Sequence, residues 1–199
     1  MHIIGLLGGV ASGKSEVARQ LAKRGAGVLD ADRAGHEVLR LPHVEEAARQ
    51  RWGEGIFGPD GHIDRSLLAK VVFSPPPKGP IERRYLEQLT HPEIGRRLAA
   101  EAQRMAAGGT KVAVLDAALI LEADWDRLCE KLVFVDAPRD VRRARALARG
   151  WSEQEFAARE DAQDSLDSKR KRADVTVDNS GSLDHTEGQV ERLWQSLIG

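Results

Sequence analysis

The sequence lacks most of the features that mark secreted, disulfide-stabilised or membrane-spanning proteins. Its single cysteine, Cys129, cannot form a disulfide within the chain, so we expect an unreactive side chain in a protein of the reducing cytoplasm. No segment approaches the roughly 20 apolar residues of a membrane span. The apolar stretch from Ile3 to Ser12 has no basic segment before it and is interrupted by glycines, which argues against a signal peptide.

An excess of charge of one sign is also missing. The chain has 30 Lys and Arg residues against 31 Asp and Glu residues, for a formal net charge of −1. Such a balance gives no overall field for binding nucleic acid or an anionic membrane, and neither is expected as a partner. An anionic ligand would therefore be held by a local cluster. The histidines show no spacing that would build a zinc site with Cys129.

Short apolar runs and amphipathic segments alternate along the chain, as in α/β proteins. Strands are predicted at His2–Leu7, Val28–Leu29, Lys111–Leu115, Lys131–Val135 and Val175–Val177. Helices are predicted at about Lys14–Arg24, Arg139–Arg149 and Glu187–Leu197. This alternation predicts a parallel sheet covered by helices on both faces.

Two segments depart from this alternation. The stretch between Asp32 and Lys111 is too long for a simple crossover and is predicted to be a largely helical insertion. It contains the proline-rich segment Ser74–Pro80, which we interpret as a stiff surface connector. The charged segment Trp151–Lys171 opens with Ser152-Glu153-Gln154-Glu155, which predicts a capping box at the start of a helix.

The sequence Gly-Gly-Val-Ala-Ser-Gly-Lys-Ser fits G-x-x-x-x-G-K-[ST], the phosphate-binding loop, or P-loop. It follows a predicted apolar strand and precedes a predicted helix, which is the context that this loop requires. Lys14 would reach the β- and γ-phosphates, and the Ser15 hydroxyl would ligate Mg²⁺. ATP or GTP binding is therefore expected. The predicted nucleotide-binding residues are Gly8, Gly9, Val10, Ala11, Ser12, Gly13, Lys14, Ser15 and Glu16.

Missing motifs narrow the class of P-loop protein. The guanine-recognition pattern Asn-Lys-x-Asp of GTPases does not occur, and no ABC-type ATPase signature is present. A carboxylate after the second strand and arginines late in the chain instead indicate a small-molecule kinase. A nucleoside monophosphate kinase is one alternative, and a nucleotide-gated binding module with hydrolysis but no acceptor is an alternative from another class.

Carboxylates follow two of the predicted strands. Asp32 comes after the second strand, and the carboxyl ends of parallel strands form the ligand-binding edge of the sheet. A carboxylate there can orient an acceptor hydroxyl for in-line attack. Asp32 could instead cap the next helix, and Asp30 could fill either role. Asp116 ends the third strand and would contact Mg²⁺ through water, with a structural hydrogen-bonding role as the alternative.

The densest basic cluster lies in one predicted helix and consists of Arg139, Arg142, Arg143, Arg145 and Arg149. Arginines suit bidentate phosphate contacts, and Arg149 precedes the turn into the charged segment. We therefore predict that Arg145 and Arg149 act on the transferring group from a mobile lid. The sequence alone does not separate Arg142, Arg143 and Arg145 as the first lid arginine.

The ordered motifs resemble those of dephospho-CoA kinases. The start from Gly5 to Ser15 is similar to G-L-T-G-G-I-G-S-G-K-[ST], and Asp30-Ala31-Asp32 matches the family's D-A-D. Further matches are Phe57-Gly58, Asp60 to Arg65, Arg83 to Ile94, Asp116 to Glu122, Arg159, Gln163, Lys169, Ala173-Asp174 and Asn179. The chain departs from the family pattern at Leu7, Ala11, Glu16 and Ala118, where Thr, Gly, Thr and Pro are usual.

The resemblance implies ATP-dependent phosphorylation of the ribose 3′-hydroxyl of dephospho-CoA. Mg²⁺ is expected as the cofactor, and the protein is expected to be a monomer. It implies one kinase domain over residues 1–199, with a nucleotide core, a helical acceptor-binding lobe and a lid. We expect the core at about residues 1–35, 111–150 and 172–199, the lobe at 36–110 and the lid at 150–171.

The resemblance also places Arg65, Arg83 and His91 with Asp32 at the acceptor. Arg65 could instead lie on a helix surface, and His91 could have no ligand. Because His91 precedes Pro92, its backbone is expected to lie outside a helix. The basic run from Lys169 to Arg172 is expected to be a solvated face or a lid hinge that could add phosphate affinity.

Overall fold

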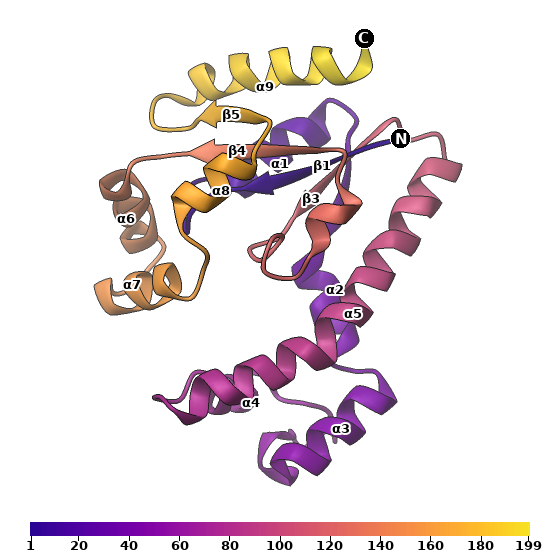
Figure 1. Ribbon diagram of the computed structural model, residues 1–199, viewed down its shortest axis with the longest axis vertical. Coiled ribbons are helices and arrows are strands. Elements are labelled where there is room, and N and C mark those ends of the chain that lie inside the picture. The colour runs from indigo at the N-terminus through magenta and orange to yellow at the C-terminus, as the bar shows by residue number, and fades with distance from the viewer. The chain divides into compact units, whose positions relative to one another are not determined.

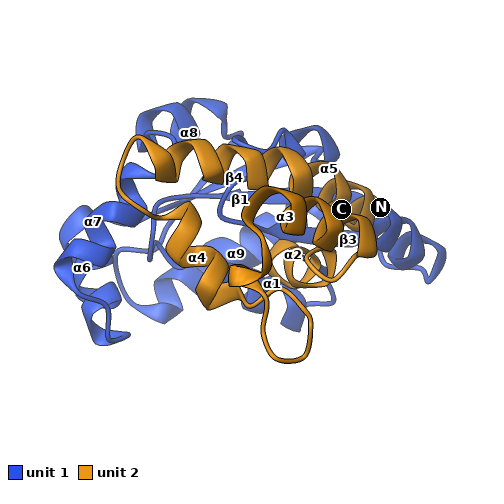
Figure 2. Ribbon diagram, turned by 90° about the horizontal axis from the view of Figure 1, so that it is seen from below, with its two compact units in different colours: residues 1–30, 100–199 blue, residues 31–99 orange.

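The computed structural model describes residues 1–199, which divide into two compact units. Unit 1 comprises residues 1–30 and 100–199, and unit 2 comprises residues 31–99 (Figure 2). All strands of the sheet lie in unit 1, whereas unit 2 is helical apart from an isolated bridge between Phe57 and Ile63. None of the helices combines the length and the apolar character that a membrane span requires.

Unit 1 is built on a five-stranded sheet of order β2-β3-β1-β4-β5 (Figure 1). Its strands are β1 (His2–Leu7), β2 (Gly27–Asp30), β3 (Val112–Asp116), β4 (Lys131–Asp136) and β5 (Val175–Asp178). All neighbouring strands are parallel, as predicted, and the register pairs Ile4 of β1 with Val114 and with Lys131. All five predicted strands are confirmed, with each end within one residue of its expected place.

Both faces of the sheet are covered, as predicted. Helices α1 (Lys14–Lys23) and α9 (Leu183–Ile198) contact each other and pack Val17, Leu21, Val190 and Leu193 into the core of one face. On the other face the chain after β3 comes close to β1, because a Cβ atom at Gly5 would lie 2.8 Å from Cys129 Sγ. The central strand β1 is therefore buried continuously from Ile4 to Leu7.

The second half of unit 1 adds helices after β4. They are α6 (Arg139–Ala148), α7 (Glu153–Asp161) and α8 (Leu166–Arg172), with a short 3₁₀ helix, η2 (Trp125–Leu128), before β4. The predicted capping box is confirmed, because the Ser152 hydroxyl accepts from Glu155 N while the Glu155 carboxylate accepts from Ser152 N. Helix α9 begins at Leu183, four residues before the predicted start, because Ser182 caps it by accepting from His185 N.

Unit 2 contains the predicted helical insertion. Its elements are α2 (Ala31–Val38), α3 (Pro42–Trp52), the 3₁₀ helix η1 (Glu54–Ile56), α4 (Arg65–Val72) and α5 (Lys78–Ala107), whose last residues belong to unit 1. Ala48, Ile56, Leu68 and Val72 form a small core of their own. This core lets unit 2 hold together through its own side chains.

Two local predictions for unit 2 are wrong. Residues His91 and Pro92 lie inside α5, although a residue before proline disfavours helical backbone. Proline removes one helical hydrogen bond, but α5 has many others, and the buried Ile94 and Leu98 fix its course beyond Pro92. Figure 1 shows α5 as a bent helix, as is common at an internal proline. The proline-rich connector is also shorter than predicted, because its residues 78–80 form the first turn of α5.

Candidate active site

The P-loop connects β1 to α1 and depends on glycine at two positions. Gly8 and Gly13 both have positive φ, at 149° and 99°. A Cβ atom at Gly8 would lie 2.5 Å from the Val135 carbonyl oxygen, and one at Gly13 would lie 2.0 Å from Asn179 Nδ2. A side chain at either position would therefore displace the strand end or the asparagine that support the loop.

Ala11 has a left-handed backbone without the benefit of glycine. Its φ is 58°, and it stands where the resemblance leads us to expect a glycine. For an L-residue with a Cβ atom, this conformation costs about 1–2 kcal/mol. The loop thus keeps its shape against a local backbone preference.

The start of α1 is open to an anion. Its N-cap residue, Gly13, provides no side-chain hydrogen bond, so the first backbone N–H groups of the helix have no cap. The Ser12 side chain is buried and its hydroxyl oxygen has no hydrogen-bond partner. Unbonded donors at a helix start suit a phosphate group.

The Lys14 ammonium folds back over the loop. Its Nζ donates to the carbonyl oxygens of Gly8 and Gly9, at 3.1 and 3.2 Å. Burial, followed by the positive charge of Lys169, lowers the pKa of Lys14 to about 8. The carboxylates of Asp116 and Glu122 act in the opposite direction and raise this pKa. These four charged side chains therefore share one small, partly dry space.

The donors available to a metal are a hydroxyl and a carboxylate. Ser15 lies in the first turn of α1, and Asp116 is the last residue of β3. No cluster of three or more His, Cys, Asp or Glu side chains in the chain is arranged to hold a metal by itself. Mg²⁺ in nucleotide sites takes one or two protein oxygens and completes its shell with phosphates and water, so this donor set fits it.

The arginines of α6 divide by what they contact. Arg142 is only 3% exposed, and its guanidinium donates to Ala137 O and Val10 O and pairs with Glu160 at 2.7 Å. Arg145 donates to the carbonyl oxygens of Ser12, at 3.2 Å, and Asn179, at 2.8 Å. Both arginines therefore hold the backbone of the P-loop from α6.

Two other arginines of α6 contact carboxylates of α7. Arg143 is exposed and pairs with Glu153 of α7, and Arg139 pairs with Glu160 at 2.9 Å. Arg149 is exposed at the C-terminal end of α6. Arg142, Arg143 and Arg145, which the sequence did not separate, thus differ clearly in their surroundings.

The segment predicted as a lid packs against the P-loop through apolar side chains. Val10 of the loop, Ala146 of α6 and Phe156 of α7 form one buried cluster, with Trp151 packed beside it. The guanidinium of Arg159 lies 4.2 Å from the ring centroid of Trp151. A displacement of α7 would therefore expose both the cluster and a flank of the P-loop.

One buried cation was missed by the sequence prediction. Lys169 of α8 is 1% exposed, whereas the rest of its basic run, residues 170–172, is exposed as predicted. Its Nζ pairs with Glu122 Oε1 at 3.0 Å and donates to Gln163 Oε1 at 3.2 Å. The expectation of a solvated face is thus wrong for Lys169. In the sequence, Lys169 differed from Lys171 only in that it matches the family pattern, as Gln163 does.

The predicted acceptor residues all lie in unit 2. Asp32 is an exposed residue in the first turn of α2, so it does not precede this helix, and Asp30 is the residue just before it. Arg65 is exposed at the first position of α4. On α5, Arg83 lies 3.8 Å from Glu87, and His91 is half-buried.

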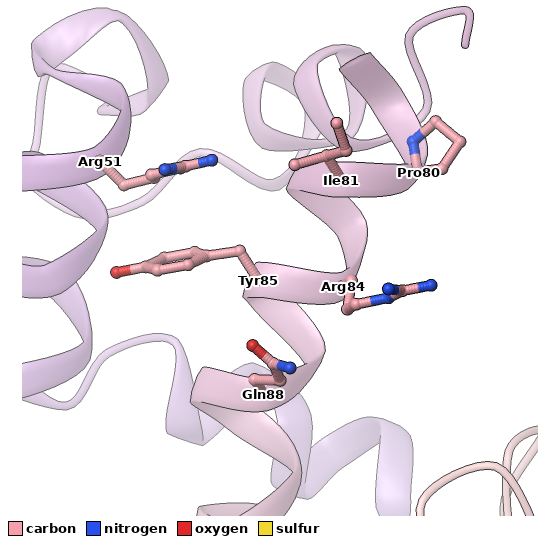
Figure 3. A pocket seen from close by; sticks show the side chains of 6 residues that line it. All are labelled: Arg51, Pro80, Ile81, Arg84, Tyr85 and Gln88. Atoms are coloured by element: carbon pink, nitrogen blue, oxygen red, sulfur yellow. The ribbon is translucent and has the colours of Figure 1, made fainter. Parts of the chain in front are cut away.

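Unit 2 also contains a cavity of about 300 Å³ between α3 and α5, which none of the predicted acceptor residues lines. Figure 3 shows Arg51 extending from α3 toward α5 and Tyr85 extending from α5 toward α3. The Arg51 guanidinium is held by Glu82 through two hydrogen bonds, at 2.9 and 3.0 Å, and Trp52 Nε1 donates to the same carboxylate. The cavity is lined by Arg51, Pro80, Ile81, Arg84, Tyr85 and Gln88.

The one cysteine is not a nucleophile in this fold. Burial raises the pKa of Cys129 to about 12, and the charge of Asp126 acts in the same direction. At neutral pH the thiolate is therefore a negligible fraction, as expected for a structural cysteine.

Known proteins resemble this chain over nearly its whole length. A family model described as dephospho-CoA kinase matches residues 2–185. The dephospho-CoA kinase of Symbiobacterium thermophilum is 41% identical over 202 residues, which span 100% of this chain and 82% of that protein. The dephospho-CoA kinase of Aquifex aeolicus is 37% identical over 200 residues, which span 99% of this chain and 98% of that protein.

Solved structures share the fold. A protein of Thermus thermophilus superposes with a TM-score of 0.82 at 35% identity, covering 100% of this chain and 98% of that one. A dephospho-CoA kinase of Campylobacter jejuni gives 0.71 at 22% identity, covering 98% and 96% of the two chains. A shikimate kinase of Acinetobacter baumannii gives 0.53 at 15% identity, covering 100% and 93%. The last two show the fold alone, which is the predicted P-loop α/β fold.

Proposed function

The chain belongs to the dephospho-CoA kinase family, and we propose from this membership how its residues divide the reaction. The family that the sequence motifs predicted is thereby confirmed. The reaction is phosphorylation of the ribose 3′-hydroxyl of dephospho-CoA by ATP, which gives coenzyme A and ADP. The observation that best supports a phosphotransferase site in unit 1 is the half-buried Lys14, which donates to Gly8 O and Gly9 O of the P-loop and whose pKa the charge of Asp116 raises.

ATP is proposed to bind at the P-loop, through residues 8–16. The uncapped start of α1 and the unpartnered Ser12 hydroxyl support this, because both offer polar groups that lack partners. Lys14 would exchange its two carbonyl contacts for the β- and γ-phosphates. In that position its charge stabilises the negative charge on the moving phosphoryl group.

Mg²⁺ is proposed to be held by the Ser15 hydroxyl and, through water, by Asp116. When bound, it would offset the negative charge of the phosphates. Asp116 is supported in this role by its place at the end of β3, where its charge acts on Lys14. Its register partner on β2 is Asp30, two residues before Asp32 in the chain.

Asp32 is proposed to orient the 3′-hydroxyl of the acceptor and to take its proton. Its exposure, in the first turn of α2, leaves its carboxylate accessible to a substrate. Arg65, Arg83 and His91 are proposed to bind the rest of the acceptor. Arg83 has only a long pairing, of 3.8 Å, with Glu87.

Arg145 and Arg149 are proposed to contact the transferring group from the last turn of α6 and its end. Arg149 is exposed there, and Arg145 already touches the P-loop through the Ser12 carbonyl. Arg145 uses two of the five N–H donors of its guanidinium on the carbonyl oxygens of Ser12 and Asn179, so others remain for the transferring group. Guanidinium groups suit this task because they offer several donors to phosphoryl oxygens.

We further propose the division into a core at about residues 1–35, 111–150 and 172–199, an acceptor-binding lobe at 36–110 and a lid at 150–171. The helical composition of unit 2 and the separate helices α7 and α8 support this division. A monomeric state and a cytoplasmic location are proposed with it.

The test is mass spectrometry of the product formed from dephospho-CoA, ATP and Mg²⁺. A gain of one phosphoryl group, located on the 3′-hydroxyl, is the expected result. A parallel reaction with nucleoside monophosphates should give no product. Phosphorylation of a nucleoside monophosphate instead, or ATP hydrolysis that is indifferent to any acceptor, would contradict the proposal.

A further inference from the structure

Lys169 differs from its neighbours on α8 in a way that calls for a function. It is 1% exposed and sits in a run whose other members, residues 170–172, are exposed. Burying an ammonium group is costly unless partners compensate for the lost water. Most lysines of this kind on a short surface helix would extend into solvent, so its direction toward the interior needs an explanation.

Helix α8 lies against the P-loop. A Cβ atom built on Gly9 would lie 3.1 Å from Leu166 Cδ2, at the first residue of α8. Lys169 follows about one turn later on α8. Its positive charge is one of the causes that lower the pKa of Lys14. The Lys169 ammonium therefore faces the same space as the Lys14 ammonium.

A carboxylate and an amide fix the Lys169 ammonium in place. Glu122 Oε1 lies 3.0 Å from Lys169 Nζ and also accepts from Asp164 N, at 3.0 Å. Gln163 Oε1 accepts from the same ammonium, at 3.2 Å. An ammonium group has three N–H donors, so one remains for a further acceptor while both contacts stay intact.

The surroundings indicate that this further acceptor is an anion. Arg142 and Lys169 both lower the pKa of Lys14, so three cations gather at the loop. Glu160 and Glu122 pair with the first two, whereas the Lys14 ammonium donates to carbonyl oxygens, and Asp116 and Glu122 act on it through their charge. One buried oxygen at the site, Ser12 Oγ, also has no hydrogen-bond partner, and its hydroxyl can donate to an anion. Such groups are rarely left unpaired in a finished site.

We propose that Lys169 is a second phosphate-binding lysine of the nucleotide site, positioned by Glu122 and Gln163, and that it contacts the phosphate chain of ATP beside Lys14. This proposal rests on the ATP site proposed above. Because Lys169 and Gln163 belong to the segment from α7 to α8, the contact also ties the position of this segment to the presence of phosphate.

The experiment compares the affinity for AMP, ADP and ATP by calorimetry, in buffer with magnesium, for wild type, Lys169→Met and Lys171→Met. A hydrogen bond to a charged group is typically worth about 10- to 100-fold in binding. Lys169→Met should therefore lose about 10- to 100-fold of the gain in affinity from AMP to ATP. Its affinity for AMP should change little. Lys171 lies on the same helix but is exposed, so Lys171→Met should behave as wild type.

A second variant separates phosphate contact from a structural role. Lys169→Met leaves the Glu122 carboxylate buried without its cation, whereas the double variant Glu122→Gln/Lys169→Met removes the pair as a unit. If Lys169 contacts phosphate, the double variant shows the same loss of phosphate-dependent affinity, and Lys169→Arg recovers part of it.

The contrary outcomes are distinct. Equal loss of affinity for AMP, ADP and ATP, or a double variant with the wild-type gain from AMP to ATP, would overturn the role of Lys169. A wild-type protein that binds AMP and ATP equally well would instead overturn the nucleotide site itself.

Discussion

The candidate residues at the P-loop of unit 1 and those of the helical unit 2 differ in how far they are buried and held by other groups. At the P-loop, Arg142 and Lys169 are buried and Lys14 is half-buried, and each is held by a backbone carbonyl or a carboxylate. In unit 2, Asp32 and Arg65 are exposed on helix surfaces. The nucleotide side is therefore built before any ligand arrives, whereas the acceptor side offers groups that the substrate must order.

This difference indicates which property, turnover or folding stability, a substitution in each region should change. Preorganised groups in a dry site act mainly on the transition state. Exposed groups on helices contribute little to folding stability, so their loss should leave the free energy of unfolding nearly unchanged.

Lys14→Ala tests the nucleotide half and should have the largest effect. A stabilising donor of this kind is worth about 3 kcal/mol or more, so kcat should fall roughly a hundredfold or further. The fold should persist, because Lys14 contacts only two carbonyl oxygens of its own loop. Steady-state kinetics and circular dichroism check both statements, with exposed Lys23→Ala, from the same helix, as the control. Near-native turnover would exclude the P-loop mechanism.

Asp32→Asn tests the acceptor half. Asparagine keeps the size and can hydrogen-bond the hydroxyl, but it cannot take the proton, so kcat should fall while affinity for dephospho-CoA changes little. General-base contributions run to about 10²–10⁴-fold, and the largely dissociative character of phosphoryl transfer favours the lower end. Turnover and calorimetric binding are the measurements.

The same substitution two residues earlier supplies the comparison. If Asp32→Asn keeps more than about a third of wild-type turnover, well above that range, the assignment is wrong. If Asp30→Asn alone then abolished turnover, the role of orienting the acceptor hydroxyl and taking its proton would belong to Asp30, at the end of β2.

Arg149→Ala and Arg143→Ala compare two exposed arginines, one just after the C-terminal end of α6 and one within this helix. Arg143 already pairs with Glu153, whereas Arg149 stands at the end of the helix, before the lid. We expect kcat to fall about tenfold or more for Arg149→Ala, because a charged hydrogen bond to the transferring group is lost. Arg143→Ala should change kcat less than about twofold, as exposed ion pairs contribute little. Equal effects on kcat would remove Arg149 from the proposed site.

Sequence patterns predicted the sheet and the P-loop well because both are local. A parallel strand buried on both faces is a short apolar run, and the loop is a contiguous motif whose glycines are fixed by backbone geometry. Contacts between distant segments were not predictable in the same way. The burial of Lys169 depends on Glu122, which lies 47 positions earlier in the sequence, and nothing in the basic run distinguishes it from Lys171.

The predicted helix boundaries were wrong where tertiary contacts or a cap outweighed the local preference that the prediction used. His91 and Pro92 continue α5 because many other helical hydrogen bonds and the buried Leu98 outweigh the effect of one proline. The early start of α9 follows from a single serine cap, which an apolar periodicity does not reveal.

The smallest expected effect concerns the backbone of the P-loop. Ala11 has a φ of 58°, so Ala11→Gly should remove about 1–2 kcal/mol of strain from the folded state. Glycine also gains about 0.4–1 kcal/mol of entropy in the unfolded chain, which offsets part of this. The net result should be a stabilisation of about 0.5 kcal/mol and a rise in Tm of about 1–2 °C.

Ala22→Gly provides a matched control with the opposite sign. Ala22 lies in the last turns of α1, where glycine should destabilise by about 0.5–1 kcal/mol and lower Tm by a few degrees. Thermal denaturation of the two variants, followed by circular dichroism, measures both shifts. If Ala11→Gly lowers Tm as much as Ala22→Gly does, the left-handed backbone at Ala11 carries no strain. The loop would then tolerate alanine without a local penalty, and the usual glycine at this position would reflect space for a ligand rather than backbone conformation.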